Sequence, residues 1–558
     1  MSSASTFDIG DILSQYALIT SEQLQSAETN RGSARLDRFL IESGAVTEEQ
    51  VLEIYSQEFG LPKRSLAGLE LNEQLLEGFP SADLFRHELL PLEEVGNTVH
   101  VAISDPFHLD ALDELASKTG FRLTPVLVRH DEIVSAIKSL YGLGGGTVEN
   151  MVLQHDGGDQ EELESADPDD LAQHASVVRL VNEMFADAVR QEASDIHFEP
   201  EIDGVSLRFR VDGMLRVEPI PPQIKQFAAA IVSRIKIMAK LNIAEKRLPQ
   251  DGRISIRVAG RELDVRVSTI PMVHGESIVM RLLDKGNRRF DMNSLDLDSE
   301  LQSRLLTLAT RPHGIVLVTG PTGSGKTTTL YSTLASIREA TKKIITVEDP
   351  VEYHLRGVYQ IQVQPKIGLD FACGLRSILR HDPDVLLVGE IRDRETAEIA
   401  VQCALTGHLV FSTLHTNDAP SAFTRLIDMG LEPYLVSSTV TAVLAQRLVR
   451  KLCPHCKRGV SPSETELPPG FSEQCEQIFE PNGCSECRST GYRGRTGIYE
   501  LLQPSEAIRE LVQKNASAIE LASVARQEGM LTLRESGWQR VRAGLTSVDE
   551  VLRVTAAE

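Results

Sequence analysis

The chain of 558 residues has no uninterrupted apolar run long enough to span a bilayer and no N-terminal charged segment followed by an apolar stretch. We therefore expect a cytoplasmic protein. Basic residues are also scarce, with 57 Lys and Arg against 80 Asp and Glu, which gives a net charge of -23. This charge would repel nucleic acid, and no basic stripe with interleaved aromatics is present, so a nucleic-acid translocase is only a distant alternative.

Cysteine is sparse as well, and the spacing of the seven residues argues for metal binding in a reducing compartment rather than for disulfides. Two C-x-x-C pairs are typical of a structural Zn²⁺ bound by four thiolates, which leaves no open position for catalysis and no need for His455 as a ligand. The alternative is a set of unligated thiols, because the pairs are farther apart than in a compact zinc ribbon. The predicted ligands are Cys453, Cys456, Cys484 and Cys487, and the other cysteines are Cys373, Cys403 and Cys475.

A phosphate-binding loop is the most specific motif. The segment GPTGSGKT at 320–327 follows an apolar run and precedes a predicted helix, as in a nucleotide-binding P-loop. Its glycines let backbone N–H groups face a phosphate, Lys326 would reach the β- and γ-phosphates, and the Thr327 hydroxyl would bind Mg²⁺. The alternative is a glycine-rich turn without a ligand. The residues predicted to contact ATP are Gly320, Pro321, Thr322, Gly323, Ser324, Gly325, Lys326, Thr327 and Thr328.

Short apolar runs after the P-loop predict strands of a parallel sheet that helices cover on both faces. Ligands bind at the carboxyl edge of such sheets, where these strands would deliver Glu348, Glu390 and His415. Hydrolysis needs a carboxylate that orients or deprotonates the attacking water, and either Glu348 or Glu390 could do so. The alternative for each glutamate is a helix cap. The runs are 344–347, 385–388 and 409–412.

The chain is too long for one hydrophobic core, so we expect several domains. One stretch contains three consecutive glycines, is rich in Asp and Glu, and lacks Lys and Arg, which predicts a flexible linker. The predicted parts are a helical repeat (1–63), an α/β docking module (64–142), the flexible acidic linker (143–170), an α+β lobe (171–297), a P-loop ATPase domain (298–450), a tetracysteine zinc module (451–497) and a C-terminal helical region (498–558).

In the α+β lobe, alternation with period two places Asp195, His197 and Glu199 on one face of a strand. A β-ribbon over 253–258 and 263–267 follows and carries four arginines. Their charges belong either to a solvated sheet face or to contacts with phosphates. These arginines are Arg253, Arg257, Arg261 and Arg266.

The N-terminal repeat consists of two predicted helix pairs, each with a threonine followed three residues later by a glutamine, which is a capping-box start. The segment RLDRFLIESGAVTEEQVLEIYSQ at 35–57 resembles the repeat of the MshE N-terminal-type domain, which in some secretion and pilus ATPases binds cyclic di-GMP. Two departures from the Arg-Leu-Gly pattern of that family predict weak or no binding of this ligand. One copy reads Arg35-Leu36-Asp37, and the other reads Asp8-Ile9-Gly10. The alternative is a helical bundle that only docks.

Four motifs resemble the Walker A, Asp box, Walker B and His box of the secretion ATPase superfamily, in the same order. They are GPTGSGKT (320–327), ITVEDPVEY (345–353), DVLLVGEIRD (384–393) and TGHLVFSTLHTND (406–418). With further segments at 194–200, 251–284 and 491–502, the resemblance covers nearly everything from about residue 177 onward. It is strongest to the GspE-type ATPases of type II secretion, with type IV pilus extension ATPases as neighbours. Pilus retraction ATPases lack the tetracysteine module, which argues against retraction.

This resemblance implies a Mg²⁺-dependent ATPase that powers type II secretion by pseudopilus assembly, or alternatively pilus extension. The implied fold is α/β: a RecA-like P-loop core with a parallel sheet, a PAS-like α+β lobe before it, an MshE-N-type N-terminal module and a tetracysteine zinc insertion. The implied assembly is a homo-hexamer of two-lobed subunits, with ATP between the lobes. A partner must hold such a protein at the inner membrane, and the implied partners are a GspL-type cytoplasmic domain on the N-terminal module and a GspF-type membrane platform.

The same resemblance assigns roles at the ATP site. Glu348 would be the general base, and Glu390 would be the Walker B glutamate. Two histidines would sense the γ-phosphate, and two arginines would reach the nucleotide from the α+β lobe. These are His408 and His415, and Arg266 and Arg281.

Overall fold

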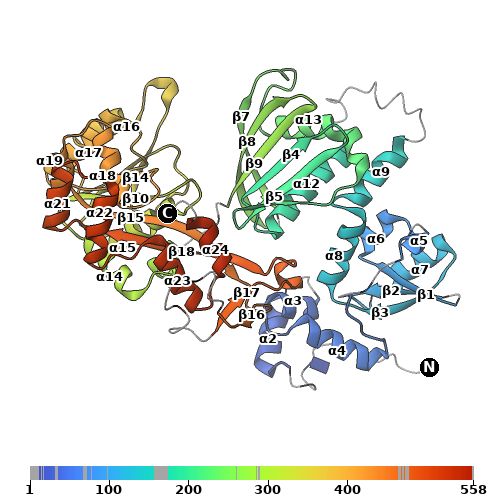
Figure 1. Cartoon of the computed structure of the whole chain (residues 1–558). Helices are drawn as coiled ribbons and strands as arrows, with labels where there is room; N and C mark the ends of the chain where they lie inside the picture. The colour runs from blue at the N-terminus through green and yellow to red at the C-terminus, as the bar shows by residue number, and fades with distance from the viewer. Residues whose placement is uncertain are drawn as a thin grey trace. The chain divides into compact units, whose positions relative to one another are not determined.

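The chain folds into two compact units, Met1–Asp284 and Lys285–Glu558, and each unit has hydrophobic cores of its own (Figure 1). The structure is a computed structural model. It describes residues 12–155 and 172–555, except 14–15, 17, 32–34, 67–68, 70–71, 77, 97, 108, 173, 259, 285, 287–289, 463–466, 468–470 and 472–476. The repeat copy with Asp8-Ile9-Gly10 and the thiol of Cys475 lie outside the described residues.

Both capping boxes predicted for the N-terminal repeat are confirmed. The Thr20 side chain accepts from the Gln23 backbone N–H while Gln23 reaches back to the Thr20 backbone, and Thr47 and Gln50 do the same. These caps satisfy backbone N–H groups that a helix start leaves unpaired. The helices of the repeat are α2 (Ser21–Asn30), α3 (Leu36–Glu42) and α4 (Glu48–Phe59).

A small α/β sheet follows the repeat. Its order is β1-β2-β3, with β1 antiparallel and β3 parallel to β2. The α/β character predicted for this module is confirmed. The elements are α5 (Glu73–Leu76), α6 (Ser81–His87), β1 (Leu90–Val95), β2 (Thr98–Ile103), α7 (Leu109–Thr119), β3 (Arg122–Leu127) and α8 (His130–Tyr141).

The prediction of a flexible linker at 143–170 is wrong for its first part, because Gly145–His155 forms helix α9. Val148 of this helix is buried in one core with Leu180 of α12 (Ala175–Arg190). Its glycines reflect close packing, since a Cβ on Gly144 would lie 2.2 Å from Leu180 Cδ1. The rest of the predicted linker lies outside the described residues.

The α+β lobe is a six-stranded antiparallel sheet in the order β6-β5-β4-β9-β8-β7, and helices α12 and α13 pack on one face (Figure 1). The predicted alternation in β4 is confirmed, because Ile196 and Phe198 are fully buried in this core while His197 and Glu199 are not. The PAS-like character of the lobe stays a prediction. The further elements are β4 (Asp195–Pro200), β5 (Val205–Val211), β6 (Met214–Val217), α13 (Ala228–Met238), β7 (Gln250–Val258), β8 (Arg261–Met272) and β9 (Gly275–Asp284).

The second unit contains a seven-stranded sheet in the order β12-β11-β13-β14-β10-β15-β18. Neighbouring strands are parallel except β15 and β18, so the predicted parallel sheet is confirmed and carries one antiparallel edge strand. The strands are β10 (Gly314–Thr319), β11 (Ile344–Glu348), β12 (Tyr359–Gln362), β13 (Val385–Val388), β14 (Leu409–Leu414), β15 (Val440–Leu452) and β18 (Tyr492–Leu502).

Helices bury both faces of this sheet. Ile315 and Leu317 of β10 belong to the core formed with α16 to α19, whereas Val316 and Val318 belong to the core formed with α14 and α15. A ligand therefore has access only at the strand ends. The helices are α14 (Ser299–Ala309), α15 (Lys326–Ile337), α16 (Phe371–Ile378), α17 (Arg394–Leu405), α18 (Pro420–Asp428) and α19 (Pro433–Thr439).

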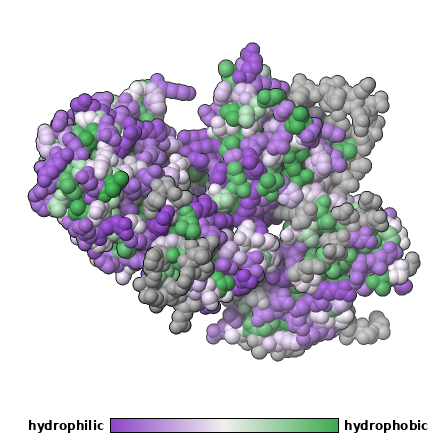
Figure 2. Space-filling model, in the orientation of Figure 1, coloured by the Kyte–Doolittle hydropathy of each residue, from purple (hydrophilic) through white to green (hydrophobic). Residues whose placement is uncertain are grey.

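The tetracysteine segment lies between the paired strands β15 and β18, and the region after β18 is helical as predicted. Among the described residues, no helix combines the length and the apolar character that crossing a membrane requires. On the face drawn in Figure 2, hydrophobic residues are scattered among hydrophilic ones. The remaining elements are β16 (Arg458–Val460), β17 (Ile478–Glu480), α21 (Glu506–Gln513), α22 (Ala518–Gln527), α23 (Leu533–Arg542) and α24 (Val548–Thr555).

Candidate ATP site and metal centre

The loop between β10 and α15 has the backbone shape of a phosphate cradle. Gly320, Gly323 and Gly325 have positive φ angles of 147°, 82° and 89°, a region that favours glycine. A Cβ on Gly320 would lie 2.5 Å from the Gln446 carbonyl oxygen, and one on Gly325 would lie 2.8 Å from the Gln446 side-chain nitrogen. The backbone can take this path only with glycine there, and the N-terminus of α15 beside it favours an anion.

Lys326 is the first residue of α15 and lies inside this cradle. Its Nζ donates to the carbonyl oxygens of Gly320 at 2.7 Å and Pro321 at 3.1 Å. Burial lowers the pKa of Lys326 to about 8, while Glu390 opposes this shift and Arg447 adds to it. A bound phosphate would stabilise the charged ammonium and remove this penalty. The residue that follows, Thr327, is exposed, so its hydroxyl is available to a metal ion.

The ends of β13 and β14 bring Glu390 and His415 to the same place. His415 Nε2 lies 3.4 Å from Glu390 Oε2, and Arg392 forms an ion pair with the other oxygen of Glu390. Glu390 is close enough to Lys326 that its negative charge opposes the lowering of the Lys326 pKa. Lys326, Glu390 and His415 therefore gather at one edge of the sheet, as the strand order predicts.

Glu348, at the end of β11, has a different environment and is only 5% exposed. Its Oε1 accepts hydrogen bonds from the Thr346 hydroxyl at 2.5 Å and from Gln360 Nε2 at 3.1 Å, and its Oε2 accepts from the Tyr331 hydroxyl. Burial and the charge of Glu348 raise the pKa of Tyr331, so this hydroxyl stays a donor. Because both oxygens of Glu348 are engaged, the geometry favours Glu390 as the carboxylate next to bound phosphates.

His408 lies at the opposite edge of the sheet. It precedes β14 whereas His415 follows it, and a six-residue strand separates its ends by about 20 Å. The His408 carbonyl accepts from the Gly314 N–H at the start of β10, and its Nδ1 lies 3.0 Å from the Cys403 carbonyl oxygen. His408 therefore lies away from the P-loop of its own chain, and its role as a sensor of the γ-phosphate stays a prediction.

Two residues beside the P-loop were not predicted, Gln446 and Arg447 of β15. The Thr329 hydroxyl of α15 donates to Gln446 Oε1 at 2.8 Å. Arg447 Nη2 donates to the Asn417 carbonyl oxygen at 2.7 Å, and its Nη1 would lie 3.1 Å from a Cβ on Gly320. A signal for both exists in the sequence, because a Gln-Arg pair interrupts the apolar run from Ala442 to Val449.

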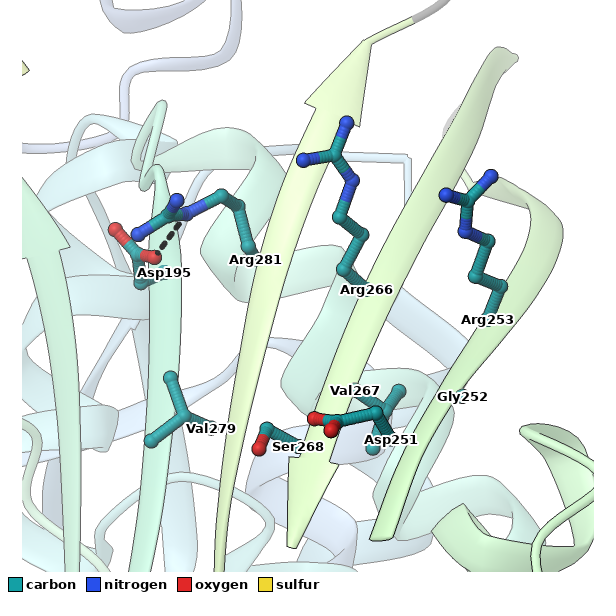
Figure 3. Close-up of a pocket in the computed structure, with 9 residues that line it drawn as sticks. All are labelled: Asp195, Asp251, Gly252, Arg253, Arg266, Val267, Ser268, Val279 and Arg281. Atoms are coloured by element: carbon teal, nitrogen blue, oxygen red, sulfur yellow. Dashed lines mark hydrogen bonds and ion pairs between the residues drawn. The ribbon is translucent and has the colours of Figure 1, made fainter. Parts of the chain in front are cut away.

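Arg266 and Arg281 belong to the first unit, where they stand opposite each other on β8 and β9. Arg281 Nε donates to Asp195 Oδ1 at 2.9 Å. Arg253 of β7 stands opposite Arg266, and the three arginines line a cavity of about 390 Å³ (Figure 3). Guanidinium groups grouped in this way can bind a phosphate.

The four predicted zinc ligands converge in one cluster. Sγ–Sγ distances are 3.8 Å for Cys453 and Cys484, and 3.7 Å both for Cys456 and Cys487 and for Cys484 and Cys487. Thiolates bound to Zn²⁺ at about 2.3 Å in a tetrahedron would lie about 3.8 Å apart, so the cluster fits this ion. Burial disfavours the Cys487 thiolate, but hydrogen bonds from the backbone N–H groups of Cys484 and Gly491, together with those from the Cys456 and Cys484 side chains, lower the pKa of Cys487 to about 7.

Comparison with known proteins identifies the family of the chain that carries these sites. The family profile described as "Type II/IV secretion system protein" matches residues 170–553. The chain belongs to this family. This secretion-family chain is 44% identical to the type II secretion system protein E of Xanthomonas campestris, over 96% of the chain and 95% of that protein. It is 41% identical to the type IV pilus assembly ATPase PilB of Myxococcus xanthus, over 99% of both.

A second profile, for the MshEN domain, matches residues 59–147 of the secretion-family chain. The match covers the α/β module with β1 to β3, and the segment 35–57 that resembles the MshE N-terminal repeat precedes it. Among solved structures, the ATPase DotB of Legionella pneumophila shares the fold, with a TM-score of 0.50 and 20% identity over 68% of this chain and 95% of DotB.

Glu390→Gln is expected to leave ATP binding within about threefold of wild type and to lower turnover at least about a hundredfold, because the variant keeps the side-chain size but cannot activate water. Nucleotide affinity by fluorescence titration and steady-state ATPase rates measure the two effects. Glu395→Gln is the matched control, because Glu395 pairs with Arg376 on the surface. Equal losses of affinity and turnover would contradict a role in the chemical step.

Cys484→Ser is expected to reduce zinc from one ion per chain to well below one, and to speed amide hydrogen exchange over 453–491, because binding energy at a thiolate site is folding energy. Metal analysis and exchange mass spectrometry give both readouts. Cys373→Ser, outside the cluster, should change neither. Wild-type protein that contains no zinc after purification without chelator would refute the site.

Proposed function

We propose that the chain is a Mg²⁺-dependent ATPase that powers type II protein secretion through pseudopilus assembly. The observation that carries the proposal is the convergence of Lys326, Glu390 and His415 at the P-loop. The chain that bears this site matches a type II secretion system protein E over nearly its whole length.

In this proposal the P-loop N–H groups and Lys326 bind the phosphates of ATP, and Thr327 holds Mg²⁺. Glu390 orients or deprotonates the attacking water, and His415, at 3.4 Å from it, responds to the γ-phosphate. Glu348 remains the family's candidate for the general base. Its three hydrogen bonds support a second role, which is to fix α15 and β12 to the end of β11.

Two further elements complete the proposed motor. Arg266 and Arg281 contact phosphates of the nucleotide, and a guanidinium that meets the charge of a transferring phosphoryl group raises turnover strongly. The tetracysteine cluster holds a structural Zn²⁺, as the Sγ–Sγ distances support. The working assembly is a homo-hexamer.

The proposed place of action is the cytoplasmic side of the inner membrane, reached through partners. A GspL-type cytoplasmic domain would bind the N-terminal module, and a GspF-type protein would be the membrane platform that receives the work. The MshEN match at 59–147 supports the N-terminal module as a regulatory or docking domain.

Pilus extension is the second candidate function, and a specific observation favours it. The type IV pilus assembly ATPase PilB is 41% identical over 99% of both chains, so its coverage exceeds that of the secretion relative. In both candidate functions the chain hydrolyses ATP, but it drives pseudopilus assembly in one and pilus extension in the other. Replacing the chromosomal gene by the Lys326→Ala variant decides between them: lost export of secreted enzymes supports secretion, whereas intact export with lost pili supports extension.

The ATPase assignment is tested with purified Lys326→Ala protein. Hydrolysis should fall by at least about a hundredfold without a change in circular dichroism, because the ammonium that would neutralise the phosphates is lost from a partly exposed loop. Lys342→Ala removes a lysine that pairs with Glu339 and serves as the control. Near-normal turnover of Lys326→Ala would contradict the assignment of the P-loop as the ATP site.

We further propose that the N-terminal repeat binds cyclic di-GMP weakly or not at all. Arg35 already donates to Asp37 Oδ2 and to Asp105 Oδ2, both at 2.6 Å, and Tyr55 donates to Asp37 at 2.6 Å. Burial alone would raise the pKa of Asp37, but Arg35 and Tyr55 hold it below its ordinary value, so the carboxylate stays charged and keeps Arg35 occupied.

Titration calorimetry with cyclic di-GMP should therefore give no heat of binding below about 100 µM ligand. This limit corresponds to a binding free energy of about 5 kcal/mol or less in magnitude. Micromolar or tighter binding by the wild-type protein would contradict the proposal.

A further inference from the structure

Three arginines form a row across the antiparallel sheet of the first unit. Arg281 of β9 is opposite Arg266 of β8, which is opposite Arg253 of β7. Neighbouring strands lie about 4.8 Å apart, so the row spans about 10 Å. Figure 3 shows the side chains of Arg266 and Arg253 extended side by side toward the same end of the sheet.

Such a row is costly unless an anion compensates it, because like charges directly opposite each other destabilise a sheet. Elsewhere on these strands the arginines are neutralised, since Arg257 pairs with Glu262 and Arg261 with Asp284. Arg253 has no carboxylate partner among the residues that the structure describes. The cavity is lined by three arginines against two aspartates, so positive charge is in excess there, although the whole chain carries a net charge of -23.

Asp195 ends the row and holds Arg281. Its side chain is only 6% exposed and accepts from the Ser194 hydroxyl at 2.8 Å and from Arg281 Nε at 2.9 Å, with Arg210 at 3.7 Å. Held from both neighbouring strands, this carboxylate cannot move with Arg281. It therefore fixes the guanidinium through Nε, and within the part of the chain that the structure describes no hydrogen bond engages the Nη groups of Arg281.

We propose that Arg253 contacts phosphate together with Arg266 and Arg281, and that Asp195 is a positioning residue that aims Arg281. The ligand class is the phosphate chain of a nucleoside triphosphate, because three guanidinium groups in a row of this length match several linked phosphates better than a single small anion. The inference rests on the proposed ATPase function and extends it to two residues, Arg253 and Asp195, to which the resemblance assigns no role.

The first experiment compares Arg253→Ala with Arg257→Ala in the full-length protein, because both remove one positive charge from the same face of β7. Affinities are measured for the Mg²⁺ complex of a non-hydrolysable ATP analogue with an imido bridge, and for Mg²⁺-ADP. Arg253→Ala should weaken the triphosphate about tenfold and the diphosphate less, and Arg253→Lys should recover part of the loss. Arg257→Ala should change both less than about twofold. Equal effects of the two alanine variants would overturn the role of Arg253.

The second experiment tests positioning with Asp195→Asn, Arg281→Ala and the double variant. Asp195→Asn should lower kcat about tenfold and change KM by less than about threefold, because Arg281 remains present but is no longer aimed. If Asp195 acts through Arg281, the double variant should be no slower than Arg281→Ala alone. Losses that multiply, or a KM change as large as the kcat change, would show that Asp195 does not act through Arg281 and would overturn this part.

Failure of this inference can be told apart from failure of the proposed function. If Lys326→Ala and Arg266→Ala lose activity while Arg253→Ala behaves as Arg257→Ala does, the ATPase assignment stands and the third arginine is refuted. If Lys326→Ala retains activity, the proposed function itself fails.

Discussion

The parallel register of β10 between β14 and β15 is the constraint on which the ATP site depends. Thr319 at the end of β10 is level with Leu414 of β14 and with Ala445 of β15. This alignment places His415 on one side of the P-loop and Gln446 on the other. Since both faces of the sheet are buried, the strand ends are the only place where polar side chains can meet a ligand, and the acidic and basic groups of the site collect there.

Local chemistry made much of this fold predictable. A strand that is covered on both faces must be apolar throughout, so β10, β11, β13 and β14 can be read from runs of Ile, Leu and Val. The capping boxes at Thr20 and Thr47 follow from residues three apart, and the tetracysteine cluster follows from paired spacing. The P-loop glycines were predictable because their backbone angles exclude other residues.

Other features depend on contacts that the sequence does not reveal. His408 and His415 share one motif, but a strand of six residues puts them at opposite edges of the sheet. The glycines before α9 look like a flexible segment until Leu180 is seen to fill the space beside Gly144. Likewise, the hydrogen bond from Tyr331 to Glu348 joins a helix and a strand whose packing no local pattern encodes.

Strand β15 connects the tetracysteine segment to the ATP site. Cys453 follows β15 directly, and its N–H donates to the Gly491 carbonyl, just before β18, at 2.8 Å. A metal ion bound by the four cysteines would hold the ends of the paired strands β15 and β18 together. Slippage of β15 by two residues would keep its side chains on the same faces but carry Arg447 about 7 Å from Gly320. A metal ion bound there would thus help to fix, from the far end of β15, which side chain lies beside the P-loop.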